Sequence, residues 1–221
     1  MTIIWDWNGT LLDDVDACVD AENSLLADRH MPPIDLVKYH EMFSFPVIDY
    51  YRRVGFTFEN ETFAAVSDQY NERYLELSRT CKLFDDAVSA LELLRSTGFS
   101  QILVTAASED LLRAQLTPFD IANYFEAMIA QKDGFGHGKT ESARLYLVEH
   151  NIDPSEIVMI GDTEHDREVA DSLGAACVLV PRGHHSRERL LNHNGKNGIV
   201  KANLIDAARW IIDNSTSGSF R

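Results

Sequence analysis

The sequence has little cysteine, and the cysteines it has are scattered. Cys18, Cys81 and Cys177 form no CxxC pair and no Cys/His cluster, which argues against a disulfide framework or a structural zinc site. No long apolar run occurs at the N-terminus either. The segment Ile3–Trp5 is interrupted by Asp6 and is far too short for a signal peptide or a membrane span. We therefore expect a cytoplasmic protein with no membrane partner.

Basic residues are scarce as well. Lys and Arg total 20 against 35 Asp and Glu, the formal net charge is −15, and no run of basic residues interrupts this balance. A nucleic-acid partner is therefore disfavoured. An acidic protein still binds phosphate where local donors and a metal ion outweigh the long-range repulsion. The composition thus favours a small-molecule partner.

The 221 residues, 45% of them hydrophobic, suffice for one medium domain with or without a smaller insertion. Short apolar runs predict strands buried on both faces at Ile3–Trp5, Ile102–Val104, Ile157–Ile160 and Cys177–Val180. Helical patterns cover Glu109–Leu116, Thr140–His150 and Glu164–Leu173, the last with Gly174 as its C-cap. This alternation predicts an α/β fold whose ligand site lies beyond the carboxyl ends of parallel strands.

The segment from about Asp14 to Lys82 does not follow this alternation. It has helical periodicity throughout, several aromatic residues and no convincing strand. We predict an all-helical subdomain, residues 14–82, inserted after the first strand and lying above the site. Residues 1–13 and 83–221 would then form the sheet domain.

The first strand leads directly into Asp6-Trp7-Asn8-Gly9-Thr10. A carboxylate at the end of a strand can attack phosphorus in line, and backbone N–H groups around Gly9 can hold phosphate oxygens in a nest. An ordinary Asx turn would use the same residues. This segment alone therefore does not decide between the two interpretations.

The third apolar run ends in a second acidic segment, Gly161-Asp162-Thr163-Glu164-His165-Asp166. Asp162 and Asp166 converge on one cation if a helix begins between them, and hard oxygen ligands suit Mg²⁺. An acid-rich helix start, favoured by the helix dipole, explains Glu164 but explains Asp162 poorly. We therefore favour the metal interpretation.

Two further positions add to this pattern. Thr105 ends the second run, where its hydroxyl can bind a phosphate oxygen, whereas Ser108 is expected to be an N-cap. Lys139 follows Gly136-His137-Gly138 at a helix start, where the dipole does not favour a cation. Neutralising a phosphate and the nucleophile would explain its placement. The alternative is an exposed surface lysine.

In chain order these segments resemble the four motifs of the haloacid dehalogenase-like superfamily, and nearly the whole chain is similar to its phosphoglycolate phosphatase-type hydrolases. The resemblance implies a Rossmann-like sheet flanked by helices, a type 1 helical cap, and Mg²⁺-dependent hydrolysis of a small phosphate monoester through an aspartyl-phosphate. The catalytic residues that it implies are Asp6, Asn8 and Lys139. The implied metal ligands are Asp6, the backbone carbonyl of Asn8 and Asp162, with Asp166 supporting them. The resemblance also implies that Thr105 and Lys139 bind the phosphoryl group, and Gly9, Thr10 and Ala106 are further candidates for binding the substrate.

One residue departs from the family's pattern. Its phosphatases usually carry Asp two residues after the nucleophile, where this chain has Asn8. That acid protonates the leaving alcohol and later deprotonates the attacking water, and an amide does neither. Its loss typically costs on the order of 10²–10⁴-fold in rate. We expect slow turnover that favours acyl or aryl phosphates, or, alternatively, a weakened protein that binds a phosphorylated metabolite or a partner.

The helical insertion contains candidates for substrate recognition. Arg52 and Arg53 project from different sides of a helix, and one of them is expected to reach an anionic tail of the substrate, although a solvated surface arginine explains each one singly. Arg182, His184 and His185 follow the last run on the same side of the sheet. The resemblance suggests phosphoglycolate, but the sequence does not name the substrate.

Overall fold

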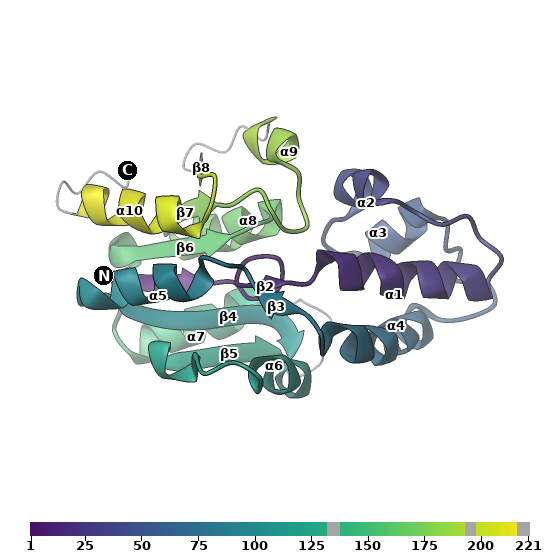
Figure 1. The fold of residues 1–221 in the computed structure, drawn as a ribbon, viewed down its shortest axis with the longest axis horizontal. Helices are drawn as coiled ribbons and strands as arrows, with labels where there is room; N and C mark the ends of the chain where they lie inside the picture. The colour runs from purple at the N-terminus through teal and green to yellow at the C-terminus, as the bar shows by residue number, and fades with distance from the viewer. Residues whose placement is uncertain (132–137, 193–197, 216–221) are drawn as a thin grey trace.

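The computed structural model describes residues 1–131, 138–192 and 198–215. A parallel sheet with the strand order β5-β4-β1-β6-β7-β8 forms the centre of the larger part of the molecule (Figure 1). Its strands are β1 (Thr2–Trp5), β4 (Ser100–Ser108), β5 (Ala127–Gln131), β6 (Ile157–Gly161), β7 (Ala176–Leu179) and β8 (Gly198–Val200). The predicted α/β class and all four predicted strands are confirmed.

Strand β1 lies in the middle of this sheet, paired with β4 and β6. Its side chains alternate between two cores, since Ile3 packs with helices α5 (Ala87–Ser96) and α10 (Leu204–Ser215), and Ile4 packs on the opposite face with α7 (Lys139–Glu149) and α8 (Glu164–Leu173). Burial of alternate residues on both faces explains why Ile3, Ile4 and Trp5 are all apolar. The sheet therefore holds Asp6, which follows β1, at a fixed place.

The remaining elements of the sheet domain are short. Helix α6 (Glu109–Leu116) follows β4, as predicted, and Ser108 caps it by accepting a hydrogen bond from the Leu111 amide at 3.3 Å. Gly174 ends α8 in the left-handed conformation, also as predicted. The other elements are α9 (Arg187–Asn192) and two 3-10 helices, η1 (Ala122–Tyr124) and η2 (Pro154–Glu156).

The helical insertion projects from the carboxyl edge of the sheet (Figure 1). It consists of α1 (Val15–Asp28), α2 (Leu36–Met42), α3 (Val47–Val54) and α4 (Phe63–Ser78), and residues 14–81 contain no strand. A two-stranded ribbon of β2 (Leu12–Asp13) and β3 (Lys82–Leu83) joins it to the sheet domain. We call these helices the cap; its exact limits at 14 and 82 stay a prediction.

The sequence-based expectation differs from the fold in two respects. Strands β5 and β8 are missing from the prediction, because β5 is only partly buried and β8 has three residues. Thr105 lies inside β4 rather than at its end. Gly136, His137 and the tail beyond Ser215 lie outside the described residues.

Candidate active site

The predicted carboxylates converge at the carboxyl edge of the sheet. The backbone amide of Asp6 donates to the Ile160 carbonyl of β6 at 2.9 Å, so the residues that follow β1 and β6 emerge side by side. Asp6 and Asp162 are both buried, with 7% and 0% of their surfaces exposed. Carboxylates are almost never buried to this extent without a cationic partner.

Lys139 supplies one positive charge to this site. It begins α7 and is 2% exposed, and its Nζ lies 2.5 Å from Asp6 Oδ1 and 2.7 Å from Asp166 Oδ1. Burial opposes the charge on Lys139, but the carboxylates of Asp166 and Asp6 outweigh this effect and raise its pKa. Lys139 is thus a buried cation between two acids, and the surface-lysine interpretation is wrong.

Asp166 holds the site together from behind. Its Oδ2 accepts from the amide and hydroxyl of Thr163 at 3.0 and 2.7 Å and from the Asp162 amide at 3.2 Å, which closes a capping box at the start of α8. Burial raises its pKa, but Lys139 outweighs burial and lowers it overall. Both oxygens are engaged, so Asp166 suits a supporting role better than direct metal binding.

The residues present fit a divalent cation. Oxygens of Asp6, Asp162 and Asp166 lie within 4.8 Å of one another, and a site built from hard carboxylate oxygens suits Mg²⁺. Burial and then the neighbouring carboxylates raise the pKa of Asp162 well above its usual value. A cation beside Asp162 would offset that repulsion and favour the ionised acid.

Gly9 and Thr10 both contact carboxylates at the edge of the site. The Gly9 amide donates to Asp14 Oδ1 at 2.7 Å and to the Leu12 carbonyl at 3.0 Å, so it is not free to bind a phosphate oxygen. A Cβ at Gly9, where φ is +73°, would lie 2.5 Å from Asp162 Oδ2. The Thr10 hydroxyl lies 3.1 Å from Asp6 Oδ2 and 3.0 Å from Asp162 Oδ1. The Gly9 amide therefore does not take part in the predicted phosphate nest, the remainder of that nest stays a prediction, and both residues shape the carboxylate pair.

Asn8 is held by a set of residues that the sequence prediction missed. Its amide nitrogen donates to Asp14 Oδ2 at 3.0 Å and to the Tyr74 hydroxyl at 2.8 Å, and lies 3.3 Å from Gln115 Oε1. Thr105 Oγ1 lies 3.4 Å from Asn8 Oδ1. Asn8 therefore connects the sheet edge to the first and last helices of the cap.

A cavity of about 710 Å³ lies between the sheet edge and the cap. Asp6, Asn8, Thr105, Ala106, Lys139 and Asp162 line its floor, and cap residues line its walls. Arg52 and Arg53 do not line it. Arg52 pairs with Asp49 and has 59% of its side chain exposed, and Arg53 bonds to Ser44 near the surface. The predicted contact of one of these arginines with substrate therefore has no support.

The loop after β7 contributes in a different way from the prediction. Of its three candidates, only His184 lines the cavity, and its Nδ1 lies 2.9 Å from the Tyr39 hydroxyl. The His184 amide donates to Asp162 Oδ2 at 2.5 Å. Arg182 pairs with Asp86. This loop therefore positions Asp162 and contacts the cap.

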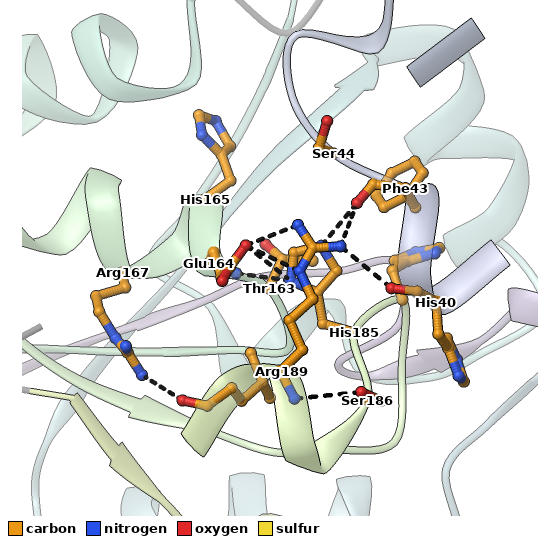
Figure 2. A network of polar contacts seen from close by, with 12 residues as sticks. His40, Phe43, Ser44, Thr163, Glu164, His165, Arg167, His185, Ser186 and Arg189 are labelled. Atoms are coloured by element: carbon orange, nitrogen blue, oxygen red, sulfur yellow. Dashed lines mark hydrogen bonds and ion pairs between the residues drawn. The ribbon is translucent and has the colours of Figure 1, made fainter. Parts of the chain in front are cut away.

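Figure 2 shows a second junction between cap and sheet domain, centred on Arg189 of α9. Its guanidinium donates to Glu164 Oε2 at 2.9 and 2.7 Å and to the carbonyls of His40 and Phe43 at 3.1 and 2.6 Å. His185 also binds the Phe43 carbonyl, at 3.2 Å. Burial, with Arg189 and His184, lowers the pKa of His185 to about 3. A neutral ring suits its second contact, in which Nδ1 accepts from the Glu164 amide at 3.0 Å.

We expect Arg189→Ala to loosen the cap. The variant loses two charge-assisted hydrogen bonds to cap carbonyls, each of which is worth about 1.5–3 kcal/mol. Amide hydrogen exchange in Leu36–Met42, followed by mass spectrometry, should therefore accelerate roughly tenfold or more. Arg187→Ala, on the exposed side of the same helix, is the matched control. Equal exchange in the two variants would show that Arg189 does not hold the cap.

Comparisons with known proteins agree with this arrangement. The family model for haloacid dehalogenase-like hydrolases matches residues 3–180, so the chain belongs to that family. It is 25% identical over 195 residues to phosphoglycolate phosphatase 1 of Pseudomonas aeruginosa, covering 83% of this chain and 70% of that protein. It is 27% identical over 194 residues to the probable phosphatase IndB of Dickeya dadantii, covering 85% and 84%.

Solved structures share the fold. A haloacid dehalogenase-like family hydrolase from Streptococcus pneumoniae superposes with a TM-score of 0.81 at 18% identity, covering 95% of this chain and 97% of that one. CbbY from Rhodobacter sphaeroides, solved in complex with phosphate, gives 0.70 at 17% identity, covering 93% and 95%. The family resemblance inferred from the sequence motifs is thereby confirmed. Within the described residues, no helix has the length and apolar character needed to cross a membrane.

Proposed function

We propose that this hydrolase is a phosphatase that cleaves a small phosphate monoester, with Asp6 as the nucleophile. The observation that carries the proposal is the buried contact of Asp6 with Lys139, 2.5 Å long, on the floor of the cavity between the sheet edge and the cap. Burial raises the pKa of Asp6 to about 7, although Lys139 lowers it. The carboxylate is therefore weakly solvated, which favours nucleophilic attack once its charge is partly offset.

Each residue has a defined part in the proposed reaction. Asp6 forms a bond to phosphorus as the ester oxygen leaves, and water then cleaves the aspartyl-phosphate. Lys139 and Thr105 bind the phosphoryl oxygens, and Lys139 also offsets the charge on Asp6. Mg²⁺, held by Asp6, Asp162 and the Asn8 carbonyl, would neutralise charge on the transferring group. Asp166 keeps Lys139 and the Asp162 backbone in place.

Asn8 would limit both steps of this reaction. Its amide already donates to Asp14 and Tyr74, and it has no proton to give to a leaving alkoxide. We propose that the phosphoenzyme is long-lived and that aryl or acyl phosphates react faster than alkyl phosphates. The idea fails if no phosphoenzyme can be trapped while alkyl phosphates turn over rapidly.

We expect Asn8→Asp to accelerate hydrolysis of alkyl phosphates by about 10–10²-fold, part of the range typical of general acid–base catalysis. The introduced carboxyl would lie beside Asp14. Repulsion between two adjacent carboxylates raises the pKa of one of them, so the pair keeps one proton. That proton is available to the leaving oxygen. The measurement is kcat/KM for phenyl and alkyl phosphates, and the gain should be larger for the poorer, alkyl leaving group. An equal gain for both would show that the carboxyl acts in another way.

The function is tested by phosphate release from p-nitrophenyl phosphate with Mg²⁺ and with EDTA. Activity that requires the metal, together with acid-stable label on the protein from a ³²P-labelled substrate, is the expected result. The second candidate, a protein that binds a phosphorylated metabolite with little turnover, is favoured by the amide at Asn8. Binding of inorganic phosphate without any hydrolysis of the aryl ester would select it.

A further inference from the structure

The cap contains a buried carboxyl that no residue neutralises. Glu22 of α1 is 1% exposed and lines the cavity. Neither of its oxygens has a hydrogen-bond partner among the residues that the structure describes. A buried carboxyl without a partner costs free energy, which a complementary ligand group would recover.

Tyr50 of α3 presents a second unused polar atom to the same cavity. Its hydroxyl is buried and likewise has no hydrogen-bond partner in the described part of the chain. The charge of Glu22 is the second cause, after burial, that raises the pKa of Tyr50. Glu22 and Tyr50 therefore line the same cavity, and each carries a buried polar atom without a hydrogen-bond partner among the described residues.

Aromatic rings lie next to Tyr50 in the wall of the cavity. The ring centroid of Tyr51 lies 5.7 Å from that of Tyr50, 5.9 Å from that of Phe63 and 6.4 Å from that of Tyr70. All four rings line the cavity. Aromatic faces attract cations, most strongly where water is excluded.

The charges on the cavity wall favour a cation over an anion. Seven carboxyl residues line it: Asp6, Asp14, Glu22, Glu72, Asp110, Asp162 and Asp166. Lys139 is the one Lys or Arg among the described lining residues, and it is bound to Asp6 and Asp166. A carboxylate tail, as in phosphoglycolate, would therefore meet acids and no available cation in the cap.

Arg29, which attracts Glu22 from the end of α1, does not neutralise it. Its guanidinium is committed to both oxygens of Glu61, at 2.5 and 2.6 Å. Burial consequently raises the pKa of Glu22 to about 8 in spite of Arg29. A positive charge on a ligand would stabilise the ionised form of Glu22.

Helix α1 sets the distance between Glu22 and the surroundings of the nucleophile. Asp14, the N-cap residue of α1, is followed at intervals of four residues by Cys18 and Glu22 within the helix, and all three line the cavity. Asp14 contacts Gly9 and Asn8 beside the nucleophile. Glu22 lies eight residues further, about 12 Å along the helix axis. A ligand spanning both ends needs a chain of several atoms.

We propose that the substrate is a phosphate monoester whose far end carries a protonated amino group, bound by Glu22 and Tyr50 within the aromatic wall. The ammonium group donates to the carboxylate and to the hydroxyl oxygen, and the rings cover its remaining surface. The proposal rests on the proposed function for the phosphate end only. It names the class of substrate that the cap selects.

The test is calorimetric binding of non-hydrolysable aminoalkylphosphonates with two, four and six carbons, in the presence of Mg²⁺. Each is compared with the alkylphosphonate of the same length. The six-carbon amine should bind about tenfold or more tightly than hexylphosphonate. Glu22→Gln should abolish this preference and Tyr50→Phe should reduce it. Glu76→Gln, an exposed change on α4, should leave it intact.

Equal binding of amine and alkyl compounds by the native chain would overturn the proposal, as would a preference that persists in Glu22→Gln. Turnover of p-nitrophenyl phosphate, measured on the same samples, distinguishes failure of the proposed substrate class from failure of the proposed phosphatase function. Full turnover without an amine preference rejects only the amine class. An amine preference without turnover rejects the phosphatase function and keeps the ligand class. Tyr50→Phe provides a second variant if Glu22→Gln does not fold.

Discussion

Asp6→Asn is expected to lower phosphate release from p-nitrophenyl phosphate by about 10⁴–10⁶-fold, the range seen when a covalent nucleophile is removed. The amide keeps the shape of the side chain but cannot form the phosphorylated intermediate. No label from a ³²P-labelled substrate should remain on the protein.

Folding should survive this change. Lys139 keeps Asp166 as a partner at 2.7 Å, and loss of the Asp6 charge removes one cause that raises the pKa of Asp162. The free energy of unfolding without metal should therefore stay close to that of the native chain, as measured by urea denaturation. Asp20→Asn, an exposed change on α1, controls for altered net charge. Retained label in Asp6→Asn would show that another residue is the nucleophile.

Lys139→Met is expected to destabilise the fold as well as reduce activity. Removing one partner of a buried ion pair typically costs about 3–5 kcal/mol, because the remaining charge is left uncompensated, and here two carboxylates lose their cation. Loss of a group that stabilises the transferring phosphoryl should lower kcat by about 10²–10³-fold. Urea denaturation and p-nitrophenyl phosphate turnover measure the two effects, with the exposed Lys38→Met as control.

The loss of unfolding free energy caused by Lys139→Met should be smaller at low pH. In the native chain Lys139 lowers the pKa of Asp166, so this contact stabilises the fold above the usual carboxyl pKa and loses its effect as pH falls through the lowered value. In the variant, burial raises the pKa of Asp166, and the acid takes up a proton on mild acidification. The difference in unfolding free energy between the two chains should therefore shrink towards low pH. A constant difference would point to lost packing of the lysine stem.

The sequence was sufficient to predict the residues at the sheet edge. Asp6 and Asp162 follow short runs of apolar residues, and parallel strands bring such ends together regardless of their distance along the chain. Lys139 was predicted because a cation at a helix start conflicts with the dipole. A residue that conflicts with the preference of its local structure, as this lysine does, often has a functional role.

The cap residues could not be predicted in the same way. Asp14 and Glu22 look like ordinary polar residues of a helix, and only the packing of α1 on α4 turns them inward. One signal was available: Asp14, Cys18 and Glu22 are spaced by four residues and so share one face of α1. Arg189 gave no signal, because its partners in the cap are backbone carbonyls 149 and 146 residues away in the chain.

The contacts of Arg189 have a consequence for how this enzyme can diversify. Phe43 lines the cavity and its carbonyl accepts a hydrogen bond from Arg189, so its main chain takes part in the contact between cap and sheet domain and its side chain belongs to the cavity wall. Mutation can therefore alter the ring without removing the oxygen that Arg189 binds. A substitution at Phe43 should therefore change the cavity wall while the contact of Arg189 with the main chain of the cap remains.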